Sequence, residues 1–198
     1  MRYLYFVLLF SLLSGCFGGG EAVPQDRYYH LADISGNVPK VSKPFGVIAV
    51  SPLQSDALHH ERTILYSLQS TPLIVNTYYY HHWSNTPGQM IQEQLIAYLR
   101  AAGFANTVIR YGERTHIDGQ ISGYIQRFER IVGEGNPKVS VRLELNFIPR
   151  SSAVQHSLTK VYSIEQVASD NSMEATAEAF SQALQKIYAR FVADVMGS

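Results

Sequence analysis

The sequence predicts an α+β domain with two layers, in which a mixed, mostly antiparallel sheet is covered by two amphipathic helices. Strands are favoured by 13 tyrosines beside many Val and Ile residues. Helices are indicated in two regions where apolar residues recur every three or four positions. At 198 residues, the chain is long enough for one domain with a substantial core.

Four strand-like runs open the predicted domain. Residues 27–31 form a short run, and the continuous apolar run at residues 45–50 is typical of a strand covered on both faces. Residues 63–69 and 73–82 follow, joined by the turn-rich segment 70–72. Two such runs with a short connection predict a β-hairpin.

A helix is predicted next, over residues 87–102. Thr86 is a good N-cap, Pro87 suits the first helical position, and Gln89 stands three residues after the cap, as in a capping box. Gly103 is placed to end the helix. One apolar stripe at helical spacing is expected to face the core: Met90, Ile91, Leu95, Tyr98, Leu99 and Ala102.

Three more strands are predicted after a short run at residues 107–109. Gly119 and Gly123 interrupt the first strand, which indicates a bulge or a close backbone approach. The second alternates over residues 139–147, which is typical of a strand with one face on the core and one in water. Its expected core residues are Val139, Val141, Leu143, Leu145 and Phe147, and its expected wet residues are Ser140, Arg142, Glu144 and Asn146. Residues 159–167 form a weaker third strand.

A second helix is predicted over residues 173–195, with Asp170 or Ser172 as its cap. Its apolar residues share a stripe that is expected to pack on the sheet: Met173, Ala177, Phe180, Leu184, Ile187, Phe191 and Val195. The two helices together would cover one face of the sheet.

The N-terminus resembles that of a bacterial lipoprotein. Arg2, an apolar stretch and small residues precede Cys16, the one cysteine of the chain, as in a secretory signal peptide. The tetrapeptide ending at Cys16 resembles a lipobox, whose cysteine receives a diacylglycerol before the preceding peptide is removed and the new amino group is acylated, for example with palmitate. We expect a signal peptide at residues 1–15, the lipidated Cys16 with a flexible tether over residues 16–26, and a domain over residues 27–198.

Composition and motifs exclude several classes of protein. Lys and Arg balance Asp and Glu at 16 each, which offers no electrostatic footprint for nucleic acid. The chain lacks nucleophile-elbow, P-loop and paired-cysteine patterns, so we expect neither enzymatic activity nor a cofactor. Glu129 and Glu134 are expected to be solvated rather than catalytic.

Two histidine pairs invite a metal-binding interpretation. Adjacent residues on an extended strand point to opposite faces, so neither His59 with His60 nor His81 with His82 can chelate one ion from such a segment. We therefore expect no metal site.

The aromatic run before the first helix offers a candidate interaction surface. On a regular strand Tyr78 and Tyr80 share one face, while Tyr79 lies opposite with Trp83. We expect Trp83 in the core. Tyr78 and Tyr80 either pack in the core or form an exposed surface for lipid or a protein partner, since tyrosine combines apolar area with a polar tip.

The stretch from residue 64 to residue 104 carries a family resemblance. It contains a strand with Ile64-Leu65-Tyr66, a strand ending Tyr78-Tyr79-Tyr80-His81-His82-Trp83, then Pro87, an amphipathic helix and Gly103-Phe104. Together with residues 27–31, 48–52 and 126–129 and the final Ala-rich helix, it resembles the ABC-type transport auxiliary lipoprotein family of the PqiC and YmbA type.

The resemblance implies a lipid-anchored, periplasm-facing, non-enzymatic accessory component of an ABC/MCE-type system that moves lipids or other hydrophobic molecules between membranes. Its partners would be MCE-domain or ABC permease components, and a homo-oligomer is compatible with such a role. Phe17 follows the lipidated Cys16, and because an aspartate there is the inner-membrane retention signal, we expect outer-membrane residence. The alternative is a lipid-binding carrier or chaperone that holds hydrophobic cargo in a cavity of its own fold.

Overall fold

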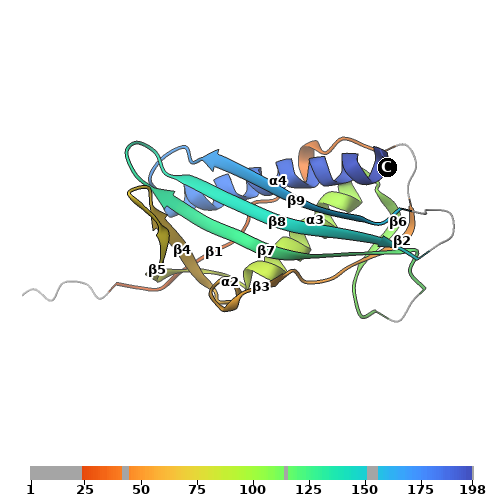
Figure 1. Cartoon of the computed structure of the whole chain (residues 1–198), viewed down its shortest axis with the longest axis horizontal. Helices are drawn as coiled ribbons and strands as arrows, with labels where there is room; N and C mark the ends of the chain where they lie inside the picture. The colour runs from red at the N-terminus through yellow and green to blue at the C-terminus, as the bar shows by residue number, and fades with distance from the viewer. Residues whose placement is uncertain (1–23, 42–44, 114–115, 151–155, 198) are drawn as a thin grey trace, which may run out of the picture.

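The computed structural model describes residues 24–41, 45–113, 116–150 and 156–197. Within these ranges, nine strands form one mixed sheet, and two long helices cover one of its faces (Figure 1). The three antiparallel ladders contain most of the paired residues, and the other five ladders are parallel. The predicted α+β fold is therefore confirmed. The signal peptide, Cys16 and most of the tether lie outside the described residues.

Strand β7 (Gly119–Val132) is the centre of the sheet. On one side it pairs antiparallel with β8 (Lys138–Pro149), which pairs in turn with β9 (Leu158–Val167). Three shorter strands lie one after another along its other side, all parallel to it: β2 (Phe45–Val50), β3 (Gln54–Ser55) and β4 (Thr63–Leu68).

The remaining strands extend the sheet outward from these short strands. β6 (Ala105–Arg110) pairs parallel with β2, which therefore has a neighbour on each side. β5 (Thr71–Trp83) forms the predicted hairpin with β4, and β1 (Arg27–Tyr29) pairs parallel with the last residues of β5.

The two predicted helices are present. Helix α3 (Pro87–Ala102) begins and ends where the sequence predicts, and Gly103 follows it in the left-handed conformation with φ of 65°. The predicted capping box is wrong in detail, because the Thr86 hydroxyl donates to Gln89 Oε1 at 3.1 Å instead of accepting from the helix backbone. Helix α4 (Met173–Gly197) is capped by Ser172, whose Oγ accepts from the Ala175 N–H at 3.0 Å. Two short helices were not predicted: η2 (Ser35–Asn37) and α2 (Ala57–His60).

Aromatic rings fill the space between the sheet and α4. The Trp83 and Phe128 rings lie 5.4 Å apart, and Phe180 of α4 lies 5.3 Å from Trp83 and 4.1 Å from Phe128. All three side chains are buried, which confirms the prediction for Trp83. Aromatic pairs at such distances add stability beyond the area that they bury.

Strand β8 shows the predicted alternation, and all five expected core residues are buried. One expected wet residue, Ser140, is also buried. Ser140 lies opposite Glu129 of β7, whose buried carboxylate faces His59 of α2. The prediction for Ser140 is therefore wrong, because this position pairs with a residue that is itself buried on the outer face.

The two glycines of β7 stand where side chains from other strands approach closely. A Cβ at Gly119 would come within 2.9 Å of Ile48 and of the Phe147 ring, and one at Gly123 would collide with the backbone carbonyl of Glu144. The predicted close approach is confirmed, while the bulge in β7 lies further along, between Ile125 and Arg127.

Changing Leu143 or Leu145 to Ala should lower the free energy of unfolding by about 2–5 kcal/mol, because both side chains are fully buried in the central layer. Arg142→Ala, an exposed position on the same strand, should change it by about 0.5 kcal/mol or less. Chemical denaturation measures all three. Equal losses at inward and outward positions would contradict the orientation of β8.

Candidate functional site

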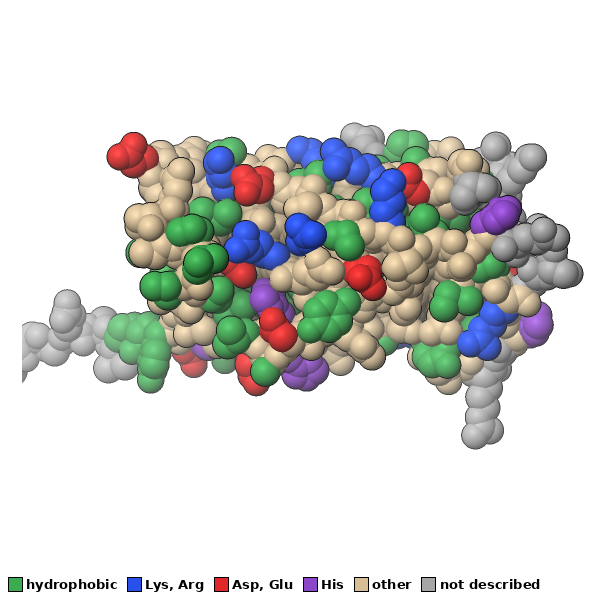
Figure 2. Space-filling view, viewed as in Figure 1, with side chains coloured by type: hydrophobic (Ala, Val, Ile, Leu, Met, Phe, Trp, Pro, Cys, Tyr) green, Lys and Arg blue, Asp and Glu red, His purple; other side chains and the backbone are tan. Residues whose placement is uncertain are grey.

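The β4–β5 hairpin carries the three most exposed large apolar side chains of the described residues, Leu73, Tyr79 and Ile74. Together with the less exposed Leu68 and Tyr80 they form a set that we call the hairpin surface. Leu73 is 95% exposed and Tyr79 is 81% exposed. Figure 2 shows apolar side chains gathered at the end of the molecule that holds β4 and β5.

Two irregularities in β5 push these residues outward. Ser67 lies opposite Val75 but Leu68 lies opposite Thr71, so residues 72–74 of β5 are extra to the ladder. In the same way, residues 78–81 of β5 face a single residue of β4. Such bulges re-aim side chains and interrupt the regular alternation of a strand.

The predicted pair, Tyr78 and Tyr80, does not share one environment. Tyr78 is half-buried, with its ring 4.5 Å from that of Tyr66 and its hydroxyl accepting a hydrogen bond from Arg130 Nη1 at 3.1 Å. Tyr80 is 37% exposed and packs edge-on against Tyr79 at 4.9 Å. The bulge thus exposes Tyr79, which alternation placed on the face of Trp83. An interaction role for Tyr78 or Tyr80 remains a prediction.

Arg130 fixes the base of the hairpin to the start of α4. This buried guanidinium donates to Tyr78, to Met173 Sδ at 2.8 Å and to the Asn171 carbonyl at 2.8 Å. Its Nε has no hydrogen-bond partner. A buried cation is strongly destabilising unless its donors are satisfied, so each of these acceptors contributes to holding the hairpin in place.

The second histidine pair lies where β5 meets β1. The Tyr29 hydroxyl and His81 Nδ1 are 2.8 Å apart, and His82 Nε2 lies 3.4 Å from an Asp26 carboxylate oxygen. Burial, with the nearby Arg27 charge, lowers the pKa of His81. Within the ranges that the structure describes, no group of three or more His, Cys, Asp or Glu side chains is arranged to hold a metal ion.

The first histidine pair lies on α2 and not on an extended segment. Asp56 caps this helix, and its Oδ1 accepts from the His59 backbone N–H at 2.9 Å and lies 2.8 Å from His59 Nδ1. His59 Nε2 faces Glu129 Oε1 at 3.7 Å, and Arg127 Nε lies 3.6 Å from the other Glu129 oxygen. His60 on the next position is exposed.

Glu129 is therefore buried in a charged cluster, and the prediction that it is solvated is wrong. Burial by itself lowers the pKa of His59, but Glu129 and Asp56 outweigh burial and hold that pKa above its ordinary value. The His59 imidazole, with its raised pKa, joins α2 to the outer face of β7. The cluster lies beneath α2, and its geometry suits the attachment of α2 to strand β7.

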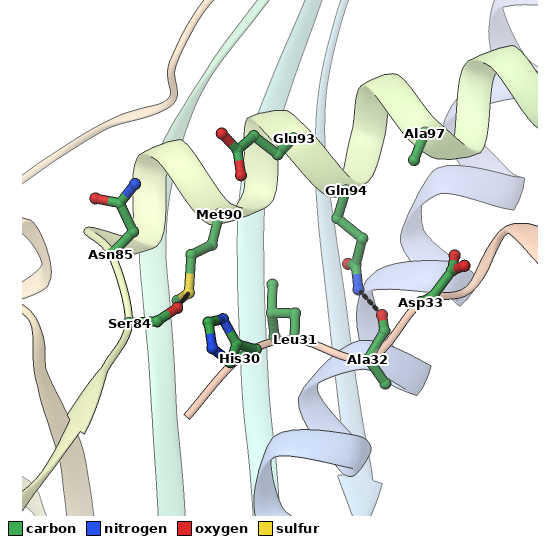
Figure 3. A pocket seen from close by; sticks show the side chains of 10 residues that line it. All are labelled: His30, Leu31, Ala32, Asp33, Ser84, Asn85, Met90, Glu93, Gln94 and Ala97. Carbon is green, nitrogen blue, oxygen red and sulfur yellow. Dashed lines mark hydrogen bonds between the residues drawn. The ribbon is translucent and has the colours of Figure 1, made fainter. Parts of the chain in front are cut away.

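An open cleft of about 470 Å³ lies between residues 30–33 and α3 (Figure 3). Gln94 donates to the Ala32 carbonyl at 2.8 Å across the cleft, and the Ser84 hydroxyl donates to Met90 Sδ at 3.7 Å. Asp33 and Glu93 add acidic groups to its lining. The serine hydroxyl is thus directed at a thioether and not at a base, which does not suit nucleophilic chemistry.

The helices of the described residues include none that is both long and apolar enough to cross a membrane.

The fold and surface define a class of protein: an α+β domain with a filled aromatic core that presents its most exposed apolar side chains on one hairpin. The chain belongs to the family described as the ABC-type transport auxiliary lipoprotein component, whose model matches residues 29–192. The resemblance found in the sequence is thereby confirmed.

Two solved structures share the fold. A protein from Xanthomonas campestris (XCC0632, family model DUF330) superposes with a TM-score of 0.67 at 19% identity, covering 84% of this chain and 92% of the other. An uncharacterized protein superposes with a TM-score of 0.66 at 11% identity, covering 86% and 99%. A comparison with curated protein sequences found no match.

Tyr78→Phe should lower the free energy of unfolding by about 1–2 kcal/mol, because it removes an acceptor from buried Arg130. Tyr79→Phe is the matched control and should have almost no effect, since Tyr79 is exposed. Urea denaturation measures both. A neutral Tyr78→Phe would show that Arg130 does not depend on this hydroxyl.

His59→Gln should destabilise the protein more at low than at high pH. Because the folded-state pKa of His59 is raised, its contribution is fully present below the ordinary value of 6.5 and is lost as pH rises through the raised value. We expect a larger loss of stability at about pH 6 than at about pH 9. His60→Gln, at the exposed neighbouring position, serves as the control. A loss independent of pH would contradict a protonated His59.

Proposed function

We propose that this chain is a non-enzymatic adaptor, anchored by acyl chains at Cys16 to the outer membrane and facing the periplasm. It would serve an ABC/MCE-type system that moves lipids or other hydrophobic molecules between membranes, with MCE-domain or permease components as partners. The observation that carries the proposal is the family match, which spans residues 29–192 and so accounts for nearly the whole described domain.

The N-terminal sequence supports the anchor. Residues 1–15 have the composition of a signal peptide, the tetrapeptide ending at Cys16 resembles a lipobox, and residues 16–26 have the glycine-containing composition of a flexible tether. Dual or triple acylation gives stable attachment, whereas one chain gives only marginal binding. The domain at residues 27–198 would then stay within about 40 Å of the bilayer, the extended length of the tether.

The packed interior favours the adaptor over the lipid carrier. Trp83, Phe128 and Phe180 occupy the space between sheet and α4 with their rings in contact, and the cleft described above is open to solvent and partly polar. A carrier for an acyl chain needs an apolar cavity that encloses most of its ligand. The geometry therefore supports a protein that acts through contacts on its surface.

Two variants test the lipid anchor and the membrane localisation separately. Cys16→Ala should abolish lipidation and release the protein from the membrane fraction. Phe17→Asp should leave the acyl chains in place but retain the protein at the inner membrane, because the sorting machinery reads that residue. Membrane fractionation, mass spectrometry of the N-terminal peptide and a transport assay measure the outcomes. Normal transport by a Phe17→Asp protein held at the inner membrane would contradict the outer-membrane adaptor.

Purification through a tag on the wild-type chain tests the partner. An adaptor should recover a membrane-embedded component of the transport system, and gently purified protein should contain no stoichiometric lipid. Stoichiometric co-purifying lipid without a protein partner would favour the carrier instead.

A further inference from the structure

The β4–β5 hairpin contains no lysine, arginine or acidic residue. The sequence has no Asp, Glu, Lys or Arg between Arg62 and Glu93, a stretch that contains both strands and their turn. The hairpin surface adds two aliphatic residues at the tip of β5 and two tyrosines further along it. A group of exposed apolar side chains without charges is typical of a site that contacts a protein or a membrane.

The course of the chain brings the anchor to the same end of the molecule. β1 runs parallel to β5 with Arg27 opposite His81, so the residues before Arg27 lead back in the direction of Tyr80. Figure 1 shows the described chain beginning at the end that holds the β4–β5 hairpin. The eleven residues from Cys16 to Arg27 span at most about 40 Å when fully extended. A bilayer that holds Cys16 is therefore within reach of the hairpin.

The edge of β5 is poorly suited to a partner strand. Two bulges, at residues 72–74 and 78–81, break its register, and Pro72 lacks a backbone N–H. Bulges and proline are the usual means of blocking strand addition at an edge. The segment between the bulges, residues 75–77, is too short for a stable ladder. An occupant that needs no regular hydrogen-bonded register fits this surface better.

We propose that the hairpin surface rests on the membrane that holds the lipid anchor, with Leu73 and Ile74 at the boundary between headgroups and acyl chains. This inference rests on the anchoring at Cys16 proposed above. Tyr79 and Tyr80 lie further from the tip, which matches the preference of tyrosine for the headgroup level. The unpaired backbone of the edge limits the depth, since open edges do not enter the hydrocarbon core.

The surroundings of the hairpin turn predict which lipids it binds. Gln69 donates its backbone N–H to the Val132 carbonyl at 2.8 Å, which places the β7–β8 turn with exposed Glu134 beside the hairpin turn. An acidic group there disfavours anionic headgroups. Binding should therefore occur on neutral phosphatidylcholine vesicles and change little with salt, because it is driven by apolar contact.

A fluorescent label tests the contact in the full, lipidated chain. Cys16 is the sole cysteine and is consumed by lipid, so Ser70→Cys in the hairpin turn introduces one free thiol for an NBD label. On phosphatidylcholine vesicles its emission should shift to the blue and be quenched by doxyl-labelled lipids. A label at Glu113→Cys, in the β6–β7 connection at the other end of the molecule in Figure 1, should remain in water.

Matched double variants show whether the aliphatic tip is responsible. Leu73→Ser with Ile74→Ser should reduce the bound fraction of the hairpin, shifting its equilibrium about tenfold or more. Ile148→Ser with Val161→Ser removes two exposed aliphatic side chains from β8 and β9 and should leave the label response unchanged. Circular dichroism verifies that each variant is folded.

Three outcomes would overturn the proposal. A label at position 70 that stays in water while mass spectrometry finds Cys16 acylated would refute the membrane contact and leave the proposed function intact. A blue shift that appears only after a transport partner is added would show that the hairpin is a protein contact. A Cys16 without acyl chains would refute the anchor, and with it both the proposed function and this inference.

Discussion

The bulge in β7 between Ile125 and Arg127 determines how the polar groups of this domain are distributed. Before the bulge, Ile121, Gly123 and Ile125 face the helices; after it, Phe128 and Arg130 do so. One extra residue exchanges the two faces of a strand because side chains alternate with a period of two. Arg130 is thereby directed inward to Tyr78 and the start of α4, while Glu129 is directed outward beneath α2.

These two buried charges attach the peripheral elements to the central strand. Arg130 holds the β4–β5 hairpin through Tyr78, and Glu129 holds α2 through His59. Buried charged groups are costly, and the lack of a hydrogen-bond partner at Arg130 Nε and Glu129 Oε2 shows that the cost is not fully offset. Apolar side chains would stabilise such contacts as well or better. What the charged groups add is a defined orientation, because a guanidinium with three acceptors permits few arrangements of the hairpin.

The regular elements were accessible from sequence and the irregular ones were not. Helix α3 and strand β8 could be predicted because each buries one continuous face. Apolar residues recur with the helical period in Met90–Ala102 and with the strand period in Val139–Phe147. Bulges change the period inside an element. The alternation rule therefore placed Tyr79 with Trp83, whereas the structure buries Trp83 and exposes Tyr79. Helix α2 spans only four residues, too few for a periodic signal, and so the burial of His59 and Glu129 was missed.

The packed core and the bulges of β5 together bear on function, because the apolar groups that could contact a lipid lie on the surface and not in a cavity. To hold an acyl chain inside, the domain would have to part Trp83, Phe128 and Phe180, and loss of the contacts of even one such ring costs about 3–5 kcal/mol. That is a large part of the stability of an ordinary domain. The exposed apolar groups of the hairpin need no such opening, because the bulges of β5 already hold them outside the core. With the anchor proposed at Cys16, such a domain would be suited to hold a position at a membrane, and less suited to carry cargo away from it.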